Sequence, residues 1–394
     1  MTKLIYSAAA LRAMAISMAG TMLAVYLTTL QFNPFTIGIA VALGLAGCAV
    51  ATLLSSLVAD RWGRRKTLIA VSLLMCVGGL ALSISQAHTI IYLALFFGMI
   101  NGMGRDRGAG LTMDQAMLPN LTDEKNRTQT FAWYNLTVDG GNAVGALLGI
   151  VPALLRNKLS FSAFSSYQSS WLIYSSLCLA ATLVILFLNQ KVELQGEYKP
   201  KTLSPESKKI VTKFALISGL DSLGGGFLSS VLLGYWFFKR FGVDESVMAP
   251  LFFAARILNA FSHLGAAWLA KRIGLVNTMV FTHLPSSLLL MTVPFTPTLS
   301  IAIILFLIRE SLVEMDVPTR QSYIIAVVKP EERTLAAGIS NLSRNIAWAI
   351  APGIGGTLMK FVSYSAPLWI GPGIKVGYDV LLYREFQHIR PPEE

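Results

Sequence analysis

Long apolar runs follow one another along almost the whole chain. Each run has the length, about 18 residues or more, that a helix needs to cross a lipid bilayer. Most of the runs lack the polar stripe that a helix on a soluble protein carries. The pattern predicts an all-α, polytopic membrane protein and disfavours a soluble helical repeat protein with a large core. Twelve transmembrane spans are expected, at residues 6–30, 35–58, 67–86, 89–118, 128–155, 170–188, 211–238, 246–270, 275–294, 298–328, 334–360 and 365–384.

The polar breaks between these spans are short, with one exception. Residues 189–210 are polar and rich in lysine, and six spans lie on each side of them. We therefore predict an N-terminal six-helix half at 1–188, a cytoplasmic linker at 189–210 and a C-terminal six-helix half at 211–394.

Composition and charge agree with the membrane prediction. Only 13% of the residues are charged and the mean hydropathy is +0.59, whereas a soluble domain carries about 25% charged residues. The net charge of +11 is high enough to suggest a nucleic-acid partner. However, Lys and Arg gather in alternate loops, which is the orientation signal of membrane proteins beside anionic lipid. We expect both termini in the cytoplasm, a location in the plasma (inner) membrane, contact with the lipid bilayer, and no nucleic acid.

No motif of metal binding or catalysis occurs in the sequence. Cys48, Cys76 and Cys178 lie inside apolar runs and lack the spacing of metal ligands. Phosphate-binding loops and hydrolase motifs are absent from the sequence as well. We expect no enzymatic activity, no metal and no cofactor.

Two pairs of segments repeat across the long break. LVADRWGRRKT at 57–67 lines up with WLAKRIGLVNT at 268–278, and RTQTFAWYNL at 127–136 lines up with RTLAAGISNL at 333–342. The repeat is six spans long. Because six is an even number, both copies should have the same orientation and be related by an axis along the membrane normal.

The two halves, the long linker and the loop between spans 2 and 3 resemble the major facilitator superfamily. The loop SLVADRWGRRKTL at 56–68 is similar to the signature of that family, a glycine followed by D-R-x-G-R-R/K, with Ser56 in place of the glycine. The resemblance implies a gating loop that latches the halves in one conformation, formed by Asp60, Arg61, Gly63, Arg64 and Arg65. By itself, the loop is a positive-inside turn in which Asp60 lies close to the N-terminus of the next helix.

Other segments bear on the subgroup and the direction of transport. The run at 315–345 resembles a poorly characterised subgroup of the superfamily. The antiporter signature G-x-x-x-G-P-x-x-G-G has a partial match at 141–150, without the proline, and APGIGG follows at 351–356. Small residues of this kind let helix backbones approach closely. The signature favours export, and the displaced proline weakens that inference.

Ionisable residues within the spans are concentrated in a few helices. Each costs about 2.5–3.5 kcal/mol at a helix centre, so such residues persist where they face a cavity or a partner. Most lie in spans 1, 4, 7 and 10, which line the central pathway in the resembled family. The pathway candidates are Arg12, Arg105, Asp106, Arg107, Asp139, Asp221, Arg256, Arg309, Glu310, Glu314 and Asp316. Spans 2, 3, 6 and 9 contain no charged residue in their apolar runs, and we expect them to face lipid or form a scaffold.

Span 4 is predicted as one continuous helix that contains GMGRDRGAG at 102–110. Successive helical residues turn by about 100°, so Arg105 and Arg107 would point to nearly opposite sides, and Arg107 would share a face with Asp114. One arginine could then face the pathway. The alternative is a helix end that meets lipid headgroups.

Span 10 raises a similar question. Glu310 and Glu314 are one turn apart and repel each other when both are ionised, which makes them candidate proton carriers. The alternative is that Arg309 or Arg105 neutralises them. Asp316 and Arg320, four residues apart, are expected to pair with each other.

Together these features predict a monomeric secondary transporter of a small polar or charged solute. It would work by alternating access, coupled to a proton or another ion, with a bias towards efflux. The first alternative is an importer or uniporter of an organic anion that uses Arg12, Arg105 and Arg256. A remote alternative is a receptor or scaffold that transports nothing.

Overall fold

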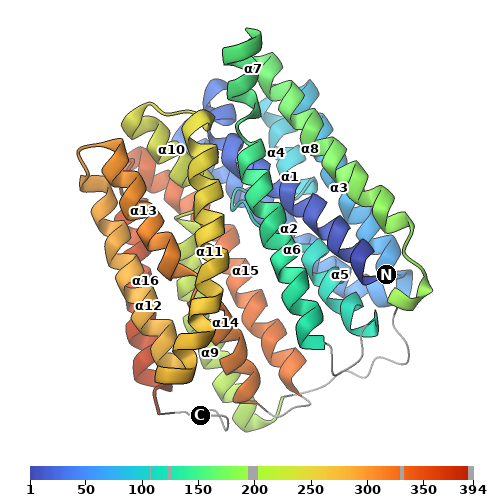
Figure 1. The fold of residues 1–394 in the computed structure, drawn as a ribbon, viewed down its shortest axis with the longest axis vertical. Helices are drawn as coiled ribbons and strands as arrows, with labels where there is room; N and C mark the ends of the chain where they lie inside the picture. Colours follow the sequence, from blue (N-terminus) through green and yellow to red (C-terminus); the bar gives the residue numbers. More distant parts are fainter. Residues whose placement is uncertain (107, 122–126, 194–202, 329–331, 389–394) are drawn as a thin grey trace. The chain divides into compact units, whose positions relative to one another are not determined.

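Most of the described part of the computed structural model is helical (Figure 1). No strand occurs there, which confirms the all-α prediction. The structure describes residues 1–106, 108–121, 127–193, 203–328 and 332–388.

Eight segments of the described residues are long and apolar enough to cross a membrane. They coincide with predicted spans 1, 2, 3 and 5 to 9. Their helices are α1 (Thr2–Thr29), α2 (Pro34–Trp62), α3 (Arg64–Ile84), α6 (Arg127–Leu148), α7 (Val151–Leu159), α8 (Ala163–Leu186), α9 (Pro205–Gly226), α10 (Ser230–Phe241), α11 (Glu245–Ile273) and α12 (Leu275–Thr292).

The other four predicted spans correspond to helices that are shorter or richer in charge. Spans 4 and 10 are each divided in two, and spans 11 and 12 are single helices. The helices are α4 (His88–Phe97), α5 (Ala109–Met117), α13 (Leu299–Val313), α14 (Asp316–Ala326), α15 (Arg333–Phe361) and α16 (Pro367–Phe386).

By their internal contacts the helices form two compact units. Unit 1 comprises Met1–Gly196 and Ser229–Phe253, and unit 2 comprises Glu197–Leu228 and Ala254–Glu394. α10 and the start of α11 thus belong to unit 1, although the chain on both sides of them belongs to unit 2. The division of the sequence into halves at 189–210 remains a prediction.

In unit 1, α1 is the central helix and packs mainly on α6 and α8. Its side chains from Ala15 to Leu27 are all buried. Small residues allow the close packing, because a Cβ atom on Gly145 of α6 would lie only 2.2 Å from the carbonyl oxygen of Met14. The glycines at 141–150 therefore serve helix packing, as their spacing predicts.

In unit 2, α9 packs on α15 and α16, and α12 packs on α16, α13 and α14. Aromatic rings join three of these helices at one end of the unit. Phe214 stacks on Tyr323 with a centroid distance of 5.7 Å, and Phe386 meets both rings edge-on.

The two units agree in local detail with the aligned segments of the repeat. α3 and α12 both begin after a glycine with positive φ, Gly63 at 110° and Gly274 at 85°. Thr67 and Thr278 each donate a hydrogen bond back to that glycine's carbonyl, at 2.9 and 2.8 Å. α6 and α15 begin at the arginines of the second aligned pair.

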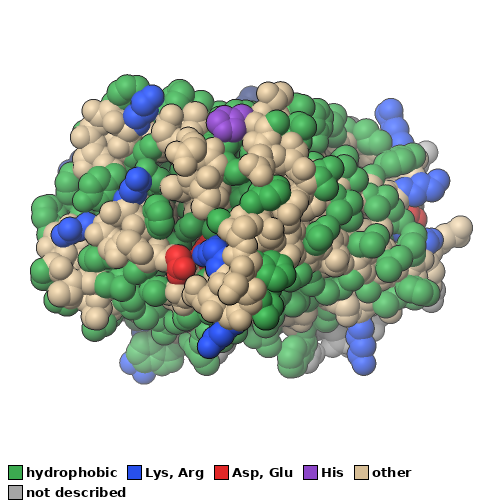
Figure 2. Space-filling model, turned by 90° about the horizontal axis from the view of Figure 1, so that it is seen from above, with side chains coloured by type: hydrophobic (Ala, Val, Ile, Leu, Met, Phe, Trp, Pro, Cys, Tyr) green, Lys and Arg blue, Asp and Glu red, His purple; other side chains and the backbone are tan. Residues whose placement is uncertain are grey.

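The surface matches a lipid environment. Figure 2 shows many hydrophobic side chains on the visible face, interspersed with other side chains and backbone, and few acidic ones. Large apolar side chains such as Leu57, Phe187, Phe295 and Phe361 are more than 60% exposed. A water-soluble monomer rarely exposes so much contiguous apolar surface.

Candidate functional site

Arg12 is buried in the interior of unit 1, where two carboxylates surround it. Its guanidinium pairs with Asp114 of α5 and lies 3.7 Å from the Asp106 carboxylate. Tyr134 of α6 donates a hydrogen bond to the same Asp114 oxygen, at 3.0 Å. Because a buried charge is tolerated only with partners, this cluster explains how α1 can carry an arginine.

The prediction of one continuous helix for span 4 is wrong. α4 ends at Phe97, α5 begins at Ala109, and the residues between them are not helical in the described part of the chain (Figure 1). The cause is close backbone packing. A Cβ atom on Gly20 of α1 would lie 2.5 Å from the Cα of Gly104, and one on Gly44 of α2 would lie 2.1 Å from the Ile100 carbonyl oxygen. Gly104 itself has a φ of 65°, which suits glycine.

The charged residues of this irregular segment therefore do not follow helical periodicity, and the opposite-face argument for Arg105 and Arg107 no longer applies. Arg105 and Asp106 are half-buried. Asp106 accepts a hydrogen bond from the backbone N–H of Gly108 at 3.0 Å and so holds the start of α5. Arg107 lies outside the described residues.

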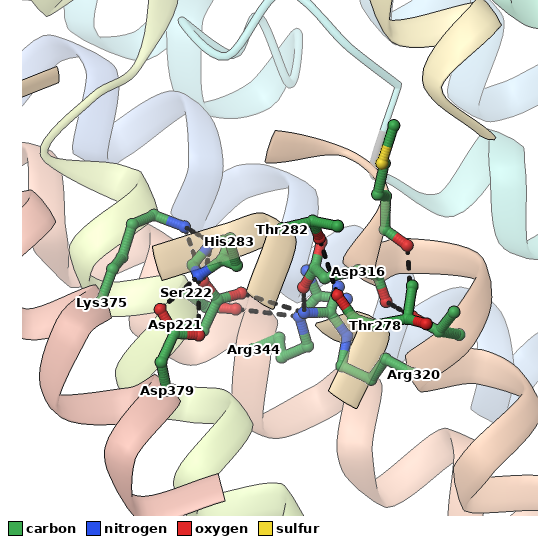
Figure 3. A network of polar contacts seen from close by, with 12 residues as sticks. Asp221, Ser222, Thr278, Thr282, His283, Asp316, Arg320, Arg344, Lys375 and Asp379 are labelled. Atoms are coloured by element: carbon green, nitrogen blue, oxygen red, sulfur yellow. Dashed lines mark hydrogen bonds and ion pairs between the residues drawn. The ribbon is translucent and has the colours of Figure 1, made fainter. Parts of the chain in front are cut away.

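Asp221 of α9 is the centre of a larger buried network in unit 2 (Figure 3). Lys375 of α16 donates to its Oδ1 at 2.6 Å, and Arg320 of α14 donates to its Oδ2 at 3.1 Å. Arg320 also pairs with Asp316 at 2.5 Å, which confirms the predicted i, i+4 pair. One carboxylate thus holds cations from two other helices.

The network continues from Lys375 to His283 of α12 and from there to Asp379 of α16. The Lys375 ammonium lies 3.0 Å from Nε2 of His283, and Nδ1 of His283 lies 2.9 Å from Asp379. An ammonium group can only donate. We therefore infer that Nε2 accepts from Lys375 and that Nδ1–H donates to Asp379.

A third cation joins through a hydroxyl group. Arg344 of α15 donates from Nε to the Ser222 hydroxyl at 2.9 Å, next to Asp221. When all six groups are ionised and the imidazole is neutral, the network holds equal numbers of opposite charges, from three carboxyl groups and three basic groups, namely Asp221, Asp316, Asp379, Arg320, Arg344 and Lys375.

Besides Arg320 and Arg344, the pathway candidates from the sequence omitted three members of this network: His283, Lys375 and Asp379. Span 9 was expected to face lipid or form a scaffold, but His283 in its middle is only 1% exposed. Two signals pointed to these residues. One is a histidine within an apolar run, and the other is a lysine and an aspartate one helical turn apart in span 12.

Span 10 also differs from its prediction, because α13 and α14 are separated by a turn at Glu314 and Met315. Arg309 pairs with Glu310, whose carboxylate also accepts from Asn259 of α11 at 3.0 Å. The alternative in which Arg309 neutralises Glu310 therefore holds in the structure. Glu314 is half-buried.

Two further pathway candidates, Asp139 of α6 and Arg256 of α11, are half-buried.

The loop between α2 and α3 connects several helix ends within unit 1. The Glu193 carboxylate accepts from the backbone N–H groups of Arg64 and Arg65, at 2.6 and 3.2 Å, and so caps the start of α3. The Arg64 side chain donates to the Ala116 carbonyl and that of Arg65 to the Leu186 carbonyl. Arg61 is exposed, and the Asp60 side chain lies outside the described part.

The comparisons with known proteins agree with this architecture. The chain matches the family model of the Major Facilitator Superfamily over residues 5–313. An uncharacterised membrane protein of Saccharomyces cerevisiae, YJR124C, is 25% identical over 384 residues, which cover 89% of this chain and 86% of that protein.

Solved structures show the same fold. A D-xylose–proton symporter aligns with a TM-score of 0.78 at 13% identity, covering 97% of this chain and 96% of the other. The nucleoside transporter NupG aligns with a TM-score of 0.76 at 14% identity, covering 98% and 99%. The match of the family model to most of the sequence, together with the fold, leads to one conclusion: this chain is a membrane transporter, not an enzyme, and it belongs to the major facilitator superfamily.

Proposed function

We propose that this transporter is secondary active, exporting a small polar or charged solute by alternating access in exchange for protons. It acts in the plasma (inner) membrane as a monomer with both termini in the cytoplasm. The observation that carries the proposal is the buried network around Asp221, in which charged groups from four helices and the His283 ring contact one another.

The chemistry of the network suits proton exchange. Chains of carboxylates and histidines inside a membrane mark proton relays in pumps and transporters. Here the charges balance when His283 is neutral, so one added proton leaves a net positive charge in a low-dielectric interior. Repulsion from Lys375 would then favour a different arrangement of the Lys375–Asp221–Arg320 contacts. A proton on the His283–Asp379 pair is thereby linked to the helix that carries Asp221.

Proton movement during solute flux tests the proposal. A thermal-shift screen of the purified protein against metabolites and drugs first supplies a solute, whose flux is then followed in proteoliposomes with a pH-sensitive dye inside. We expect proton movement with the wild type and none with Asp379→Asn. The control is Glu385→Gln, which removes a surface partner of Lys213 and should leave coupling unchanged. Solute flux without proton movement in the wild type would reject the proposal.

Export is supported by the small-residue stretches at 141–150 and 351–356, which are similar to parts of the antiporter signature. Vesicles with an imposed pH gradient test the direction. In exchange, an acidic interior should drive solute into the vesicle as protons leave it. Solute that moves in the same direction as the protons would show symport and overturn the export proposal.

A second candidate function is the import or uniport of an organic anion. It is favoured by one observation, since Nη1 of the buried Arg12 has no hydrogen-bond partner among the described residues. Such a donor could bind a carboxylate or phosphate. The triple variant Arg12→Gln, Arg105→Gln and Arg256→Gln should then lose uptake of the anion. Uptake at the wild-type rate in a folded triple variant would exclude this candidate.

A further inference from the structure

Arg344 of α15 differs from the other two basic residues of the Asp221 network (Figure 3). Lys375 and Arg320 each form an ion pair with a carboxylate. Among the described residues, Arg344 forms no ion pair, and its hydrogen bond runs from Nε to the Ser222 hydroxyl. Its Nη1 and Nη2 atoms therefore carry N–H groups that this part of the chain does not use.

These terminal nitrogens are also accessible. The Arg344 side chain is half-buried. Nη1 of Arg12 is one of the buried atoms that lack a partner among the described residues, but Nη1 and Nη2 of Arg344 are not. Because they have no partner there either, they must reach the accessible surface. They can bind an anion from outside the protein while Nε keeps its bond to Ser222.

Trp348, one helical turn further along α15, restrains the guanidinium of Arg344. The guanidinium lies 4.5 Å from the centre of the Trp348 ring, a cation–π contact. The Trp348 side chain is only 7% exposed. A donor that is already held by the indole and by Ser222 loses less conformational entropy when it binds a ligand. Its planar fork of N–H groups also fits the two oxygens of a carboxylate or phosphate.

The same face of α15 carries two amide side chains. By their spacing, four residues share this face, within about 100° of the helix: Asn341, Arg344, Asn345 and Trp348. Neither Asn341 nor Asn345 is hydrogen-bonded to another described side chain or backbone group. Ile346 and Ile350, each more than half exposed, lie on nearly the opposite side. We therefore infer that the isoleucines face lipid and that the amides face away from it.

We propose that Arg344 and Trp348 form an anion subsite for the transported solute, with Asn341 and Asn345 beside it. The inference rests on the proposed function, because it names the solute as a small hydroxylated organic anion, a carboxylate or a phosphate ester. The acidic group pairs with the Nη1 and Nη2 atoms of Arg344. The hydroxyl groups bond to the two amides, which both donate and accept. All four residues belong to unit 2, so the subsite is separate from the Arg12 cluster.

Equilibrium binding to the purified full-length protein in detergent tests the subsite. The probes are inorganic phosphate and two matched pairs, gluconate with sorbitol and glycerol 3-phosphate with glycerol, at constant ionic strength. The concentration dependence of the melting temperature gives each affinity. We expect the anions to bind and the two alcohols not to bind, because only the anions pair with Arg344.

Variants then place the anion on the guanidinium. Arg344→Lys keeps the charge but loses the fork, and it should weaken anion binding about tenfold. Arg344→Gln should weaken it about a hundredfold, and Trp348→Phe about threefold. The matched control is Arg272→Gln. Arg272 lies 4.0 Å from the ring of Trp268, four residues before it, but it is exposed, and its removal should leave anion binding unchanged.

Several outcomes would overturn the proposal. They are no binding of any anion, equal binding of the matched alcohols, wild-type affinity in folded Arg344→Gln, and an equal loss in Arg272→Gln. If Arg344→Gln fails to fold, Arg344→Lys decides. Phosphatidylglycerol in mixed micelles is the lipid arm, and its binding at Arg344 in place of the soluble anions would also reject the subsite. Because binding is measured without a gradient, a failure of proton coupling or of export would leave this result unchanged.

Discussion

Each unit places a buried ion pair between its first helix and the second piece of a divided helix. In unit 1 the pair is Arg12 of α1 with Asp114 of α5, and in unit 2 it is Asp221 of α9 with Arg320 of α14. The helices are spans 1 and 4 in one unit and spans 7 and 10 in the other, so the repeat relates them. The signs of the charges are exchanged. We therefore infer that an ion pair at this position stabilises the packing of the two helices, whichever of them carries the anion.

The units differ in what lies beyond the pair. Among the described residues, the cluster in unit 1 comprises Arg12, Asp106, Asp114 and Tyr134, and α8 contains no Asp, Glu, Lys, Arg or His. In unit 2 it continues through Lys375 and His283 to Asp379, on α12 and α16. Since the described part of unit 1 holds its divided helix without such an extension, we propose that the extension has another role. This asymmetry directs our proton-coupling proposal to unit 2.

The largest expected effect comes from removing the central carboxylate of each unit. Asp221→Asn leaves both Lys375 and Arg320 facing a neutral amide, whereas Asp114→Asn leaves Arg12 with Asp106 nearby. Breaking a buried pair costs about 3–5 kcal/mol, and we expect Asp221→Asn at the upper end and Asp114→Asn below it. Thermal unfolding in detergent, followed by tryptophan fluorescence, measures the difference. The reverse order would show that the two pairs are not related as described.

Replacing each pair by apolar residues sharpens the comparison. A buried ion pair can often be exchanged for apolar side chains at little cost. The double variant Arg12→Met, Asp114→Leu should therefore recover most of the stability lost in either single variant, to within about 1 kcal/mol of wild type. Asp221→Leu, Arg320→Met should stay about 3 kcal/mol below it, because Lys375 loses its carboxylate partner and Asp316 loses its arginine partner. Thermal unfolding of all single and double variants completes the double-mutant cycle in each unit. If the double variant recovered its stability in unit 2 as well as in unit 1, the expected difference between the units would be contradicted.

The next effect is on coupling rather than on stability. In His283→Gln the amide can accept from Lys375 and donate to Asp379, but it cannot carry a proton. We expect the free energy of unfolding to stay within about 1 kcal/mol of the wild-type value. The proton-driven flux of solute should fall about tenfold or more. Tyr134→Phe is the matched change in unit 1, and it should lose about 1 kcal/mol of stability with coupling intact. Solute flux in proteoliposomes and thermal unfolding are measured for both variants. Intact coupling in His283→Gln would show that the imidazole does not carry the proton.

The fold and one central residue of each cluster, Arg12 and Asp221, could be predicted from the sequence, and the reasons are physical. Long apolar runs must be spans, and an ionisable residue within a run must have a partner, so Arg12 and Asp221 stood out. Their partners could not be assigned, because contacts such as Asp221–Lys375 join residues 154 positions apart. The break in span 4 was hidden as well, since its cause is the approach of Gly20 and Gly44 from other helices. His283 was overlooked because a neutral imidazole adds no formal charge to an apolar run.

The smallest effect concerns the matched glycines before α3 and α12. Gly63 and Gly274 have φ angles of 110° and 85°, which strain any residue with a Cβ atom. Each change to alanine should cost about 1 kcal/mol or more, measured by thermal unfolding. At Gly63 the new Cβ would also lie 3.3 Å from a Glu193 carboxylate oxygen, tighter than an ordinary contact, and would press on the group that caps α3. We therefore expect Gly63→Ala to be the more damaging of the two. If Glu193→Ala, which removes the capping side chain, abolishes that excess, the excess arises from the cap. If the excess persists, it arises from backbone strain at Gly63, and the loops of the two repeats differ in conformation rather than in their partners.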